Sequence, residues 1–277
     1  MNKLITANFS RLFKDRVFWL SVATMLILSV IIMITGYREL SDSEKLGYTL
    51  IIDDYCFNLV PAFGLFYAIF ISLFLGTDYS DGTIRNKLIV GHTRTHIYLA
   101  NFVTCFVAGL FFLAAWIIGS LVGLPMLGFW QMGIEGFALY VLVAIFFTLA
   151  FTAIFTLLST LSTNKAITAV IAILLFLGLI MAASMTYNRL HEPEFNNNVI
   201  LTMDGLQSGE ATPNPNYISG SVRTIYELIL DLLPTGQGIL MSNLEITHPI
   251  QQMISSLLIT LCTVVVGIIA FAKKDLN

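Results

Sequence analysis

The residues best suited to chemistry with a partner lie in a polar connector, residues 77–97, between two long apolar stretches. Within it, Asp81 and Gly82 predict a turn. The following residues, 83–90, predict one short amphipathic helix, which Gly91 can cap at its end. A short exposed helix of this kind predicts recognition of another protein rather than covalent chemistry.

The side chains of this predicted helix divide into an apolar face and a basic flank. Ile84, Leu88 and Ile89 are expected on one face, with Arg85 largely elsewhere and Arg94 just before the next apolar stretch. An apolar ridge with basic flanks suits docking in a groove of a second protein, and Leu88 is expected in the contact. The alternative is a solvated connector that lies on lipid head groups.

The sequence carries none of the local motifs of a nucleotide-binding or hydrolytic site. It has no G-x-x-x-x-G-K-[ST] loop, no H-E-x-x-H pair and no G-x-S-x-G elbow. Its three cysteines are far apart and form no C-x-x-C pair. We therefore expect no catalytic residue, no metal site and no cofactor bound by this chain.

Six long apolar stretches must position the connector. Hydrophobic residues make up 57% of the chain, the mean hydropathy is +0.83, and both values exclude an ordinary soluble domain. Runs of about 18 or more apolar residues predict membrane spans, and they lie at 17–36, 59–76, 98–123, 137–158, 167–185 and 253–272. None contains Asp, Glu, Lys, Arg or His, which disfavours an intramembrane enzyme or a proton-coupled carrier.

The charges of the connectors predict the orientation of these spans. Ten of the 14 Lys and Arg residues fall in the terminal segments and in the second and fourth connectors, which share one side of a six-span chain. The positive-inside rule then places both termini in the cytoplasm of a multi-pass protein of the cell membrane. We expect Glu44 and Glu210 outside, and Lys165 and Asn277 inside. The whole chain, residues 1–277, is expected to form one membrane domain.

Two flanking segments are expected to lie at the membrane surface. Residues 1–16 predict an amphipathic interfacial helix, with Asn8 and Arg11 on the polar face toward the head groups; a cytoplasmic extension of the first span is the alternative. The long outer connector, 186–252, predicts an irregular loop and then a short amphipathic helix at 222–233. Pro234 is expected to end that helix, which lies on the outer surface or between the spans.

The connector resembles the membrane subunits of type-2 ABC exporters, a family of permeases. An acidic residue, Gly-Thr, an apolar-basic helix and Gly-x-x-Arg before the next span carry the resemblance. The matching residues are Asp78, Gly82, Thr83, Leu88, Gly91 and Arg94. The topology of essentially the whole chain also fits. Asp78 departs from the pattern, since the family usually has Glu at this position.

This resemblance implies an all-α integral membrane protein with six spans and a coupling helix between spans 2 and 3. It implies that the permease pairs with a second copy or a sister permease, while two cytoplasmic ABC ATPase subunits bind ATP and Mg. Ile84 and Arg85 would join the six matching residues in contacting the ATPase. The lipid bilayer is a further partner, and no nucleic acid is expected.

The pathway is expected between the two permeases. The residues that we expect to face it are Phe63, Phe66, Tyr67 and Phe70 of the second span and Leu174, Leu177 and Met181 of the fifth. Each set shares one helix face, and ordinary helix packing is the alternative for both. Such walls suit an apolar or amphipathic cargo. By analogy with bacterial permeases for peptide export and immunity, we expect an amphipathic peptide.

A second class of function fits the same sequence. A membrane sensor or assembly factor would use the connector to anchor a cytoplasmic partner without transport. A P-loop ATPase encoded next to this chain would favour the exporter.

Overall fold

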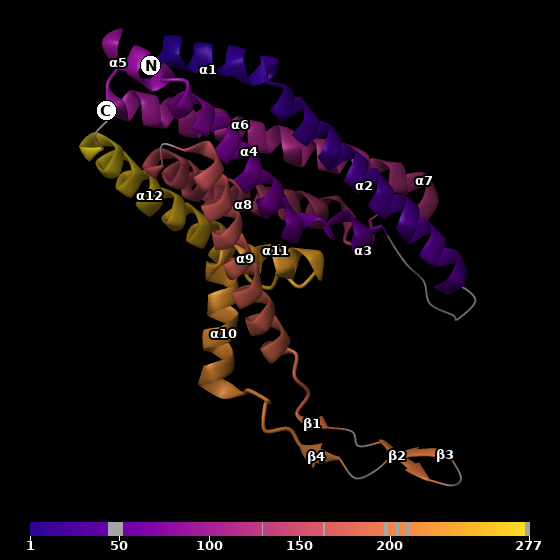
Figure 1. Cartoon of the computed structure of the whole chain (residues 1–277). Coiled ribbons are helices and arrows are strands. Elements are labelled where there is room, and N and C mark those ends of the chain that lie inside the picture. Colours follow the sequence, from indigo (N-terminus) through magenta and orange to yellow (C-terminus); the bar gives the residue numbers. More distant parts are fainter. Residues whose placement is uncertain are drawn as a thin grey trace.

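The computed structural model describes residues 1–43, 52–128, 130–162, 164–196, 199–202, 205–208 and 211–274. Glu44, Glu210 and Asn277, for which we predict a side of the membrane, lie outside the described residues. The described chain is mostly helical, with four short strands (Figure 1).

Six helices of the described chain are long and apolar enough to cross a membrane. They are α2 (Arg16–Ser43), α4 (Val60–Ser80), α6 (Arg94–Ser120), α8 (Gly133–Leu161), α9 (Lys165–Leu190) and α12 (Pro249–Lys273). Each predicted apolar stretch lies on one of these helices or its immediate extension, so the prediction of six spans by length and composition is confirmed. The cytoplasmic placement of the termini stays a prediction from the charges.

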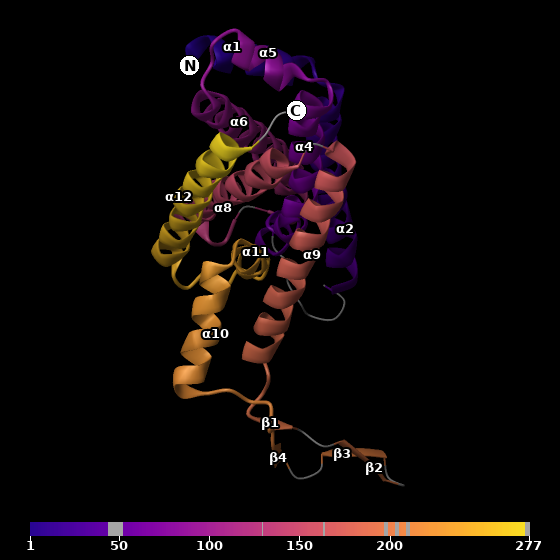
Figure 2. The ribbon, with the colours of Figure 1, turned by 60° about the vertical axis from the view of Figure 1, so that its left-hand side comes forward.

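The bundle has a buried centre and an exposed periphery. In the most apolar parts of α4, α6 and α8, between 50% and 67% of the residues are buried. In the corresponding parts of α2, α9 and α12, between 22% and 28% are buried. Aromatic rings fill the centre, where their large flat side chains pack against one another. Figures 1 and 2 show both ends of the chain at one end of the bundle, beside α1 (Asn2–Lys14) and α5 (Thr83–Ile89). We call this the basic end.

Helix α1 is amphipathic as predicted, but its polar face is partly turned inward. Leu4 and Leu12 are buried, and so is Asn8, which hydrogen-bonds to α6. Arg11 also reaches inward, to α4. The prediction that Asn8 and Arg11 face the head groups is therefore wrong. The physical reason is that both find partners on neighbouring helices, which helical periodicity alone does not reveal.

At the opposite end, the long connector contains more structure than predicted. Strand β1 (Phe195–Asn196) pairs with β4 (Thr212–Pro213), and β2 (Val199–Thr202) pairs with β3 (Gly205–Ser208). These antiparallel pairs form an arm that projects away from the helices (Figure 2). The prediction of an irregular loop is wrong here, because strands of two to four residues are too short for a recognisable alternating pattern.

Two helices follow the arm. The predicted amphipathic helix is present as α10 (Gly220–Leu232), and α11 (Pro234–Ser242) begins directly after it. Pro234 thus starts a second helix instead of only ending the first, since proline fits the first turn of a helix. Residues 234–241 are buried, and α11 packs against α4, α8 and α9. Three short helical segments, α3 (Asp53–Cys56), η2 (Leu121–Gly123) and α7 (Leu124–Leu127), complete this end.

Candidate functional site

Helix α5 is the predicted coupling helix, and it spans Thr83–Ile89. Gly82 precedes it in a left-handed conformation, with φ 67°, which glycine adopts without strain. Ile84 is buried and joins a cluster with Leu4 of α1 and Phe271 of α12, and Leu88 is partly buried against this cluster. The inner side of α5 is thus held against its own chain.

Ile89 does not share the inner face with Ile84 and Leu88. It is 81% exposed, and Val90 is 76% exposed. Leu88 follows Ile84 by four residues and returns to nearly the same direction, whereas Ile89 points about 140° away from Ile84. The predicted single apolar face is therefore corrected to two: one inward, and one at the exposed end of α5.

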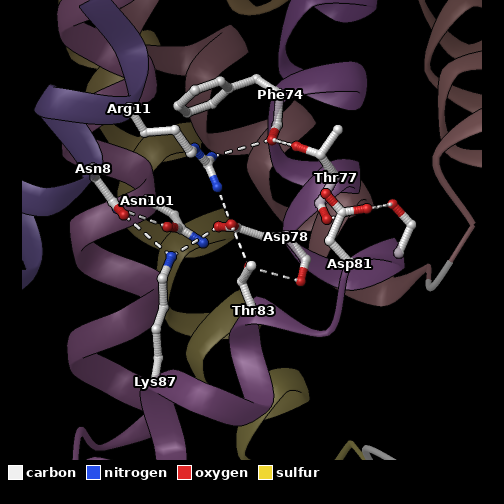
Figure 3. Close-up of polar contacts among 10 residues, drawn as sticks. Asn8, Arg11, Phe74, Thr77, Asp78, Asp81, Thr83, Lys87 and Asn101 are labelled. Atoms are coloured by element: carbon white, nitrogen blue, oxygen red, sulfur yellow. Dashed lines mark hydrogen bonds and ion pairs between the residues drawn. The ribbon is translucent and has the colours of Figure 1, made fainter. Parts of the chain in front are cut away.

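Asp78, at the end of α4, is 1% exposed and lies at the centre of a polar cluster (Figure 3). Arg11 of α1 forms an ion pair with its Oδ1. The Lys87 Nζ of α5 lies 2.9 Å from its Oδ2, and the Thr83 hydroxyl donates to its Oδ1 at 2.7 Å. One buried carboxylate therefore ties three helices together.

The cluster also reaches α6. The Asn8 Nδ2 donates to the Asn101 Oδ1 at 2.9 Å, and Lys87 Nζ donates to the Asn8 Oδ1 at 3.1 Å. The Arg11 guanidinium lies 4.0 Å from the centre of the Phe74 ring, a cation–π arrangement. We call Asn8, Arg11, Asp78, Thr83, Lys87 and Asn101 the Asp78 lock.

Charge and burial oppose each other in the Asp78 lock. Burial lowers the pKa of Lys87 to about 8, and the positive charge of Arg11 acts in the same direction. Burial also lowers the pKa of Arg11. Asp78 favours the charged form of both, because an opposite charge within 4 Å offsets part of the desolvation cost. The lock therefore depends on its single carboxylate to hold two cations.

Arg94 caps a helix rather than facing outward. Its Nη1 donates to the carbonyl oxygens of Phe271 at 2.8 Å, Ala272 at 3.1 Å, and Lys274. These groups lie at the end of α12, where the carbonyl oxygens of a helix have no partner four residues further on; Phe271 O also accepts from Lys274 N at 3.4 Å. Lys274 in turn donates to Thr160 O at 2.6 Å, at the end of α8.

The predicted coupling residues thus separate into three groups by exposure. Asp78 and Ile84 are buried, and Gly82, Thr83, Leu88 and Arg94 are half-buried. Arg85 and Gly91 are exposed beside Ile89 and Val90. We call these last four residues the α5 tip. It offers exposed apolar side chains to a partner.

The aromatic residues of the second span lie in the core of the bundle. Phe63, Tyr67 and Phe70 are each 2% exposed or less, and Phe66 packs against the same core. The Tyr67 hydroxyl donates to Cys105 O at 2.6 Å and lies 2.6 Å from the Thr152 Oγ1. This packing favours the alternative of ordinary helix packing for the stripe, in which Phe63, Tyr67 and Phe70 are buried and Phe66 is partly exposed.

The residues proposed on the fifth span are arranged differently. Leu174 is 62% exposed, Leu177 47% and Met181 63%. Gly178 lies among them. Apart from its chain neighbours and the nearby backbone of α9, no atom of the described residues lies within 4 Å of the position that a Cβ would take there. Helix α9 therefore presents an exposed apolar face, with a small depression at Gly178 where there is no side chain.

The residues that surround Asp78 in the Asp78 lock are not recognisable as its partners from the sequence. Asn8, Arg11, Lys87 and Asn101 come from segments up to 93 residues apart. The available signal in the sequence was the carboxylate of Asp78 just after an apolar stretch, because a carboxylate at such a position needs a positively charged or hydrogen-bonding partner. Within the described residues, no group of three or more His, Cys, Asp or Glu side chains is placed to hold a metal ion.

The sequence matches no protein-family profile, and no curated protein is significantly similar to it.

Proposed function

We propose that this chain is the transmembrane subunit of an ATP-driven exporter, and that its α5 tip docks on a separate cytoplasmic ATPase. The observation that carries the proposal is the Asp78 lock. A helix that only joined two spans would need no buried ion pairs. Here α5 is fixed to α1, α4 and α6, so a force applied at its tip would move these helices together.

The α5 tip supports docking on a protein. Ile89 and Val90 are apolar and almost fully exposed at the end of the bundle that carries the positive charge. Arg85 beside them adds a cation that an acidic rim can bind. A small apolar anchor with a charged flank is the pattern that a helix uses in a protein groove.

The open face of α9 supports pairing with a second copy or a sister permease. Two α9 faces, each with Leu174, Leu177 and Met181, would enclose an apolar path. Leucine and methionine side chains adapt to irregular apolar surfaces. The cargo is accordingly an amphipathic peptide or another apolar or amphipathic molecule. ATP and Mg belong to the partner ATPase.

The proposal predicts that a P-loop ATPase is encoded beside this chain, and co-purification with that ATPase tests the docking step. Ile89→Asp combined with Val90→Asp should abolish capture, because docking would bury unpaired charges. Thr95→Asp is the control, since it adds a charge to an exposed position in the first turn of α6, outside the α5 tip. Leu88→Asp is less suitable than the sequence suggested, because Leu88 also packs inside its own chain.

Unchanged capture by the double variant would refute docking through the α5 tip. The non-transporting anchor is separated by a second measurement, ATP hydrolysis in reconstituted membranes. An anchor would bind the ATPase, and no amphipathic peptide would stimulate hydrolysis. In an exporter, such stimulation should fall in a Leu177→Ala, Met181→Ala variant while capture stays intact.

A further inference from the structure

The bend between α1 and α2 holds two cations that the protein itself does not use. Lys14 ends α1 and Arg16 begins α2, and both are exposed. Within the described chain neither forms an ion pair or a hydrogen bond through its side chain. By contrast, Arg11, three residues before Lys14, is bound to Asp78 and Phe74.

Asp15, the acidic residue between these two cations, hydrogen-bonds to backbone N–H groups. The Asp15 Oδ1 accepts from Val17 N at 2.7 Å and from Phe18 N at 3.1 Å, which caps the first turn of α2. Its carboxylate therefore pairs with neither Lys14 nor Arg16. The bend presents two positive charges with no acidic side chain directed at them.

Aromatic side chains surround the same bend. The Trp19 Nε1 donates to Phe13 O at 2.8 Å, which joins the start of α2 to the end of α1. The Trp19 ring is 49% exposed and Phe13 is 44% exposed, next to Leu20 at 68%. Exposed aromatic rings beside Lys and Arg are typical of the boundary between head groups and acyl chains.

We propose that this bend is a binding site for the head group of an anionic glycerophospholipid. Lys14 and Arg16 would contact the phosphate and the charged head group, and Trp19 and Phe13 would lie against the acyl chains. The occupant follows from charge complementarity, because two unpaired cations above an exposed aromatic surface match an anionic amphiphile. The proposal does not depend on the exporter function, because it concerns only the bend and the bilayer.

The test is quenching of Trp19 fluorescence by brominated lipids. The chain has three tryptophans, so Trp116 and Trp130 are replaced by Phe to leave Trp19 alone. This variant is reconstituted with phosphatidylcholine and either brominated phosphatidylglycerol or brominated phosphatidylcholine. We expect a preference for the anionic lipid of about fivefold or more, and its loss in the Lys14→Ala, Arg16→Ala variant.

Lys165→Ala is the matched control, because Lys165 is an exposed lysine at the same end of the bundle. It should keep the preference. Equal quenching by both lipids, or a preference that survives the double substitution, would overturn the site. The same follows if lipid preference is absent and the double variant instead loses the ATPase, since the cations would then serve a protein.

If the single-tryptophan chain does not fold, thermal unfolding of the native chain tests the same lipid site. Phosphatidylglycerol should raise its Tm more than phosphatidylcholine does, and the double variant should lose this difference. An identical lipid dependence of Tm in both proteins would refute the proposal.

Discussion

The two ends of the bundle each bury an aspartate between helices, but they compensate its charge differently. At the basic end, Asp78 is paired with Arg11 and Lys87. At the opposite end, Asp231 of α10 is 2% exposed and accepts from the Gln252 Nε2 of α12 at 2.7 Å. Its other oxygen lies 3.2 Å from the Nδ1 of His248, a half-exposed residue.

At the opposite end, the groups around the buried aspartate are mainly side-chain amides, whereas at the basic end they are cations. Gln237 of α11 is fully buried and donates to the carbonyl oxygens of Asp231 at 2.8 Å and Gln252 at 3.1 Å. Its Oε1 accepts from Ser256 at 2.9 Å. Neutral hydrogen bonds are each worth about 1 kcal/mol, whereas a buried cation left without its partner costs several times as much. The two ends should therefore respond very differently to loss of a carboxylate.

The largest effect is expected for Asp78→Asn. The variant keeps the shape of the side chain but leaves Arg11 and Lys87 close together without a counter-charge. The expected loss is about 3–5 kcal/mol of folding free energy. Thermal unfolding of the purified chain in one detergent measures it. Adding Lys87→Met should recover part of the loss, because one uncompensated cation is removed. A wild-type Tm for Asp78→Asn would refute the lock.

Gly236→Ala should come next, at the opposite end. A Cβ at Gly236 would lie 2.4 Å from the backbone oxygen of Leu230, so the turn between α10 and α11 would have to open. We expect a cost of about 1–3 kcal/mol. Gly238→Ala is the matched control in the same helix, since its Cβ would meet nothing closer than 3.4 Å. Equal Tm values for the two variants would contradict the close packing at this turn.

A smaller effect is expected for Asp231→Asn. The amide oxygen still accepts from Gln252, and no permanent cation is left unpaired, so the cost should be about 1 kcal/mol. Measured beside Asp78→Asn under the same conditions, this variant tests the comparison directly. Similar losses in the two variants would mean that the charge of Asp78 has no special role.

The smallest effect is expected for Arg94→Ala. The side chain caps the end of α12 but is partly exposed, so we expect a loss of about 1 kcal/mol or less. Arg85→Ala, at an exposed position of α5, should leave Tm unchanged and serves as the control. If Arg85→Ala is the more destabilising of the two, our assignment of inward and outward cations is wrong.

The spans and the position of α5 followed from the sequence because both are local properties. An uncharged run such as 167–185 is long enough to cross a bilayer whatever it packs against. Gly82 and Gly91 likewise delimit α5 in the structure as they do in the sequence. The strand pairs of the arm and helix α11 were missed, because short segments acquire their structure from partners distant in the chain.

The two candidate pathway sets illustrate the same limit. The second-span stripe and the fifth-span stripe are equally regular in sequence, yet Tyr67 is buried and Met181 is 63% exposed. Helical spacing tells which side chains share a face. Which helix occupies the centre depends on how all six pack, and no single helix contains that information.

The sequence by itself determined that the chain has six segments long and apolar enough to cross a membrane, and that its basic residues gather in particular connectors, because apolar length and charge are counted along the chain. Only the tertiary structure decided what each cation does. Of the ten Lys and Arg residues at the basic end, four bind groups on other helices, namely Arg11, Lys87, Arg94 and Lys274. Six stay exposed, namely Lys3, Lys14, Arg16, Arg85, Lys165 and Lys273. The physical reason is that a buried charge is stable only where the fold brings a partner within about 3–4 Å, and those partners come from other helices.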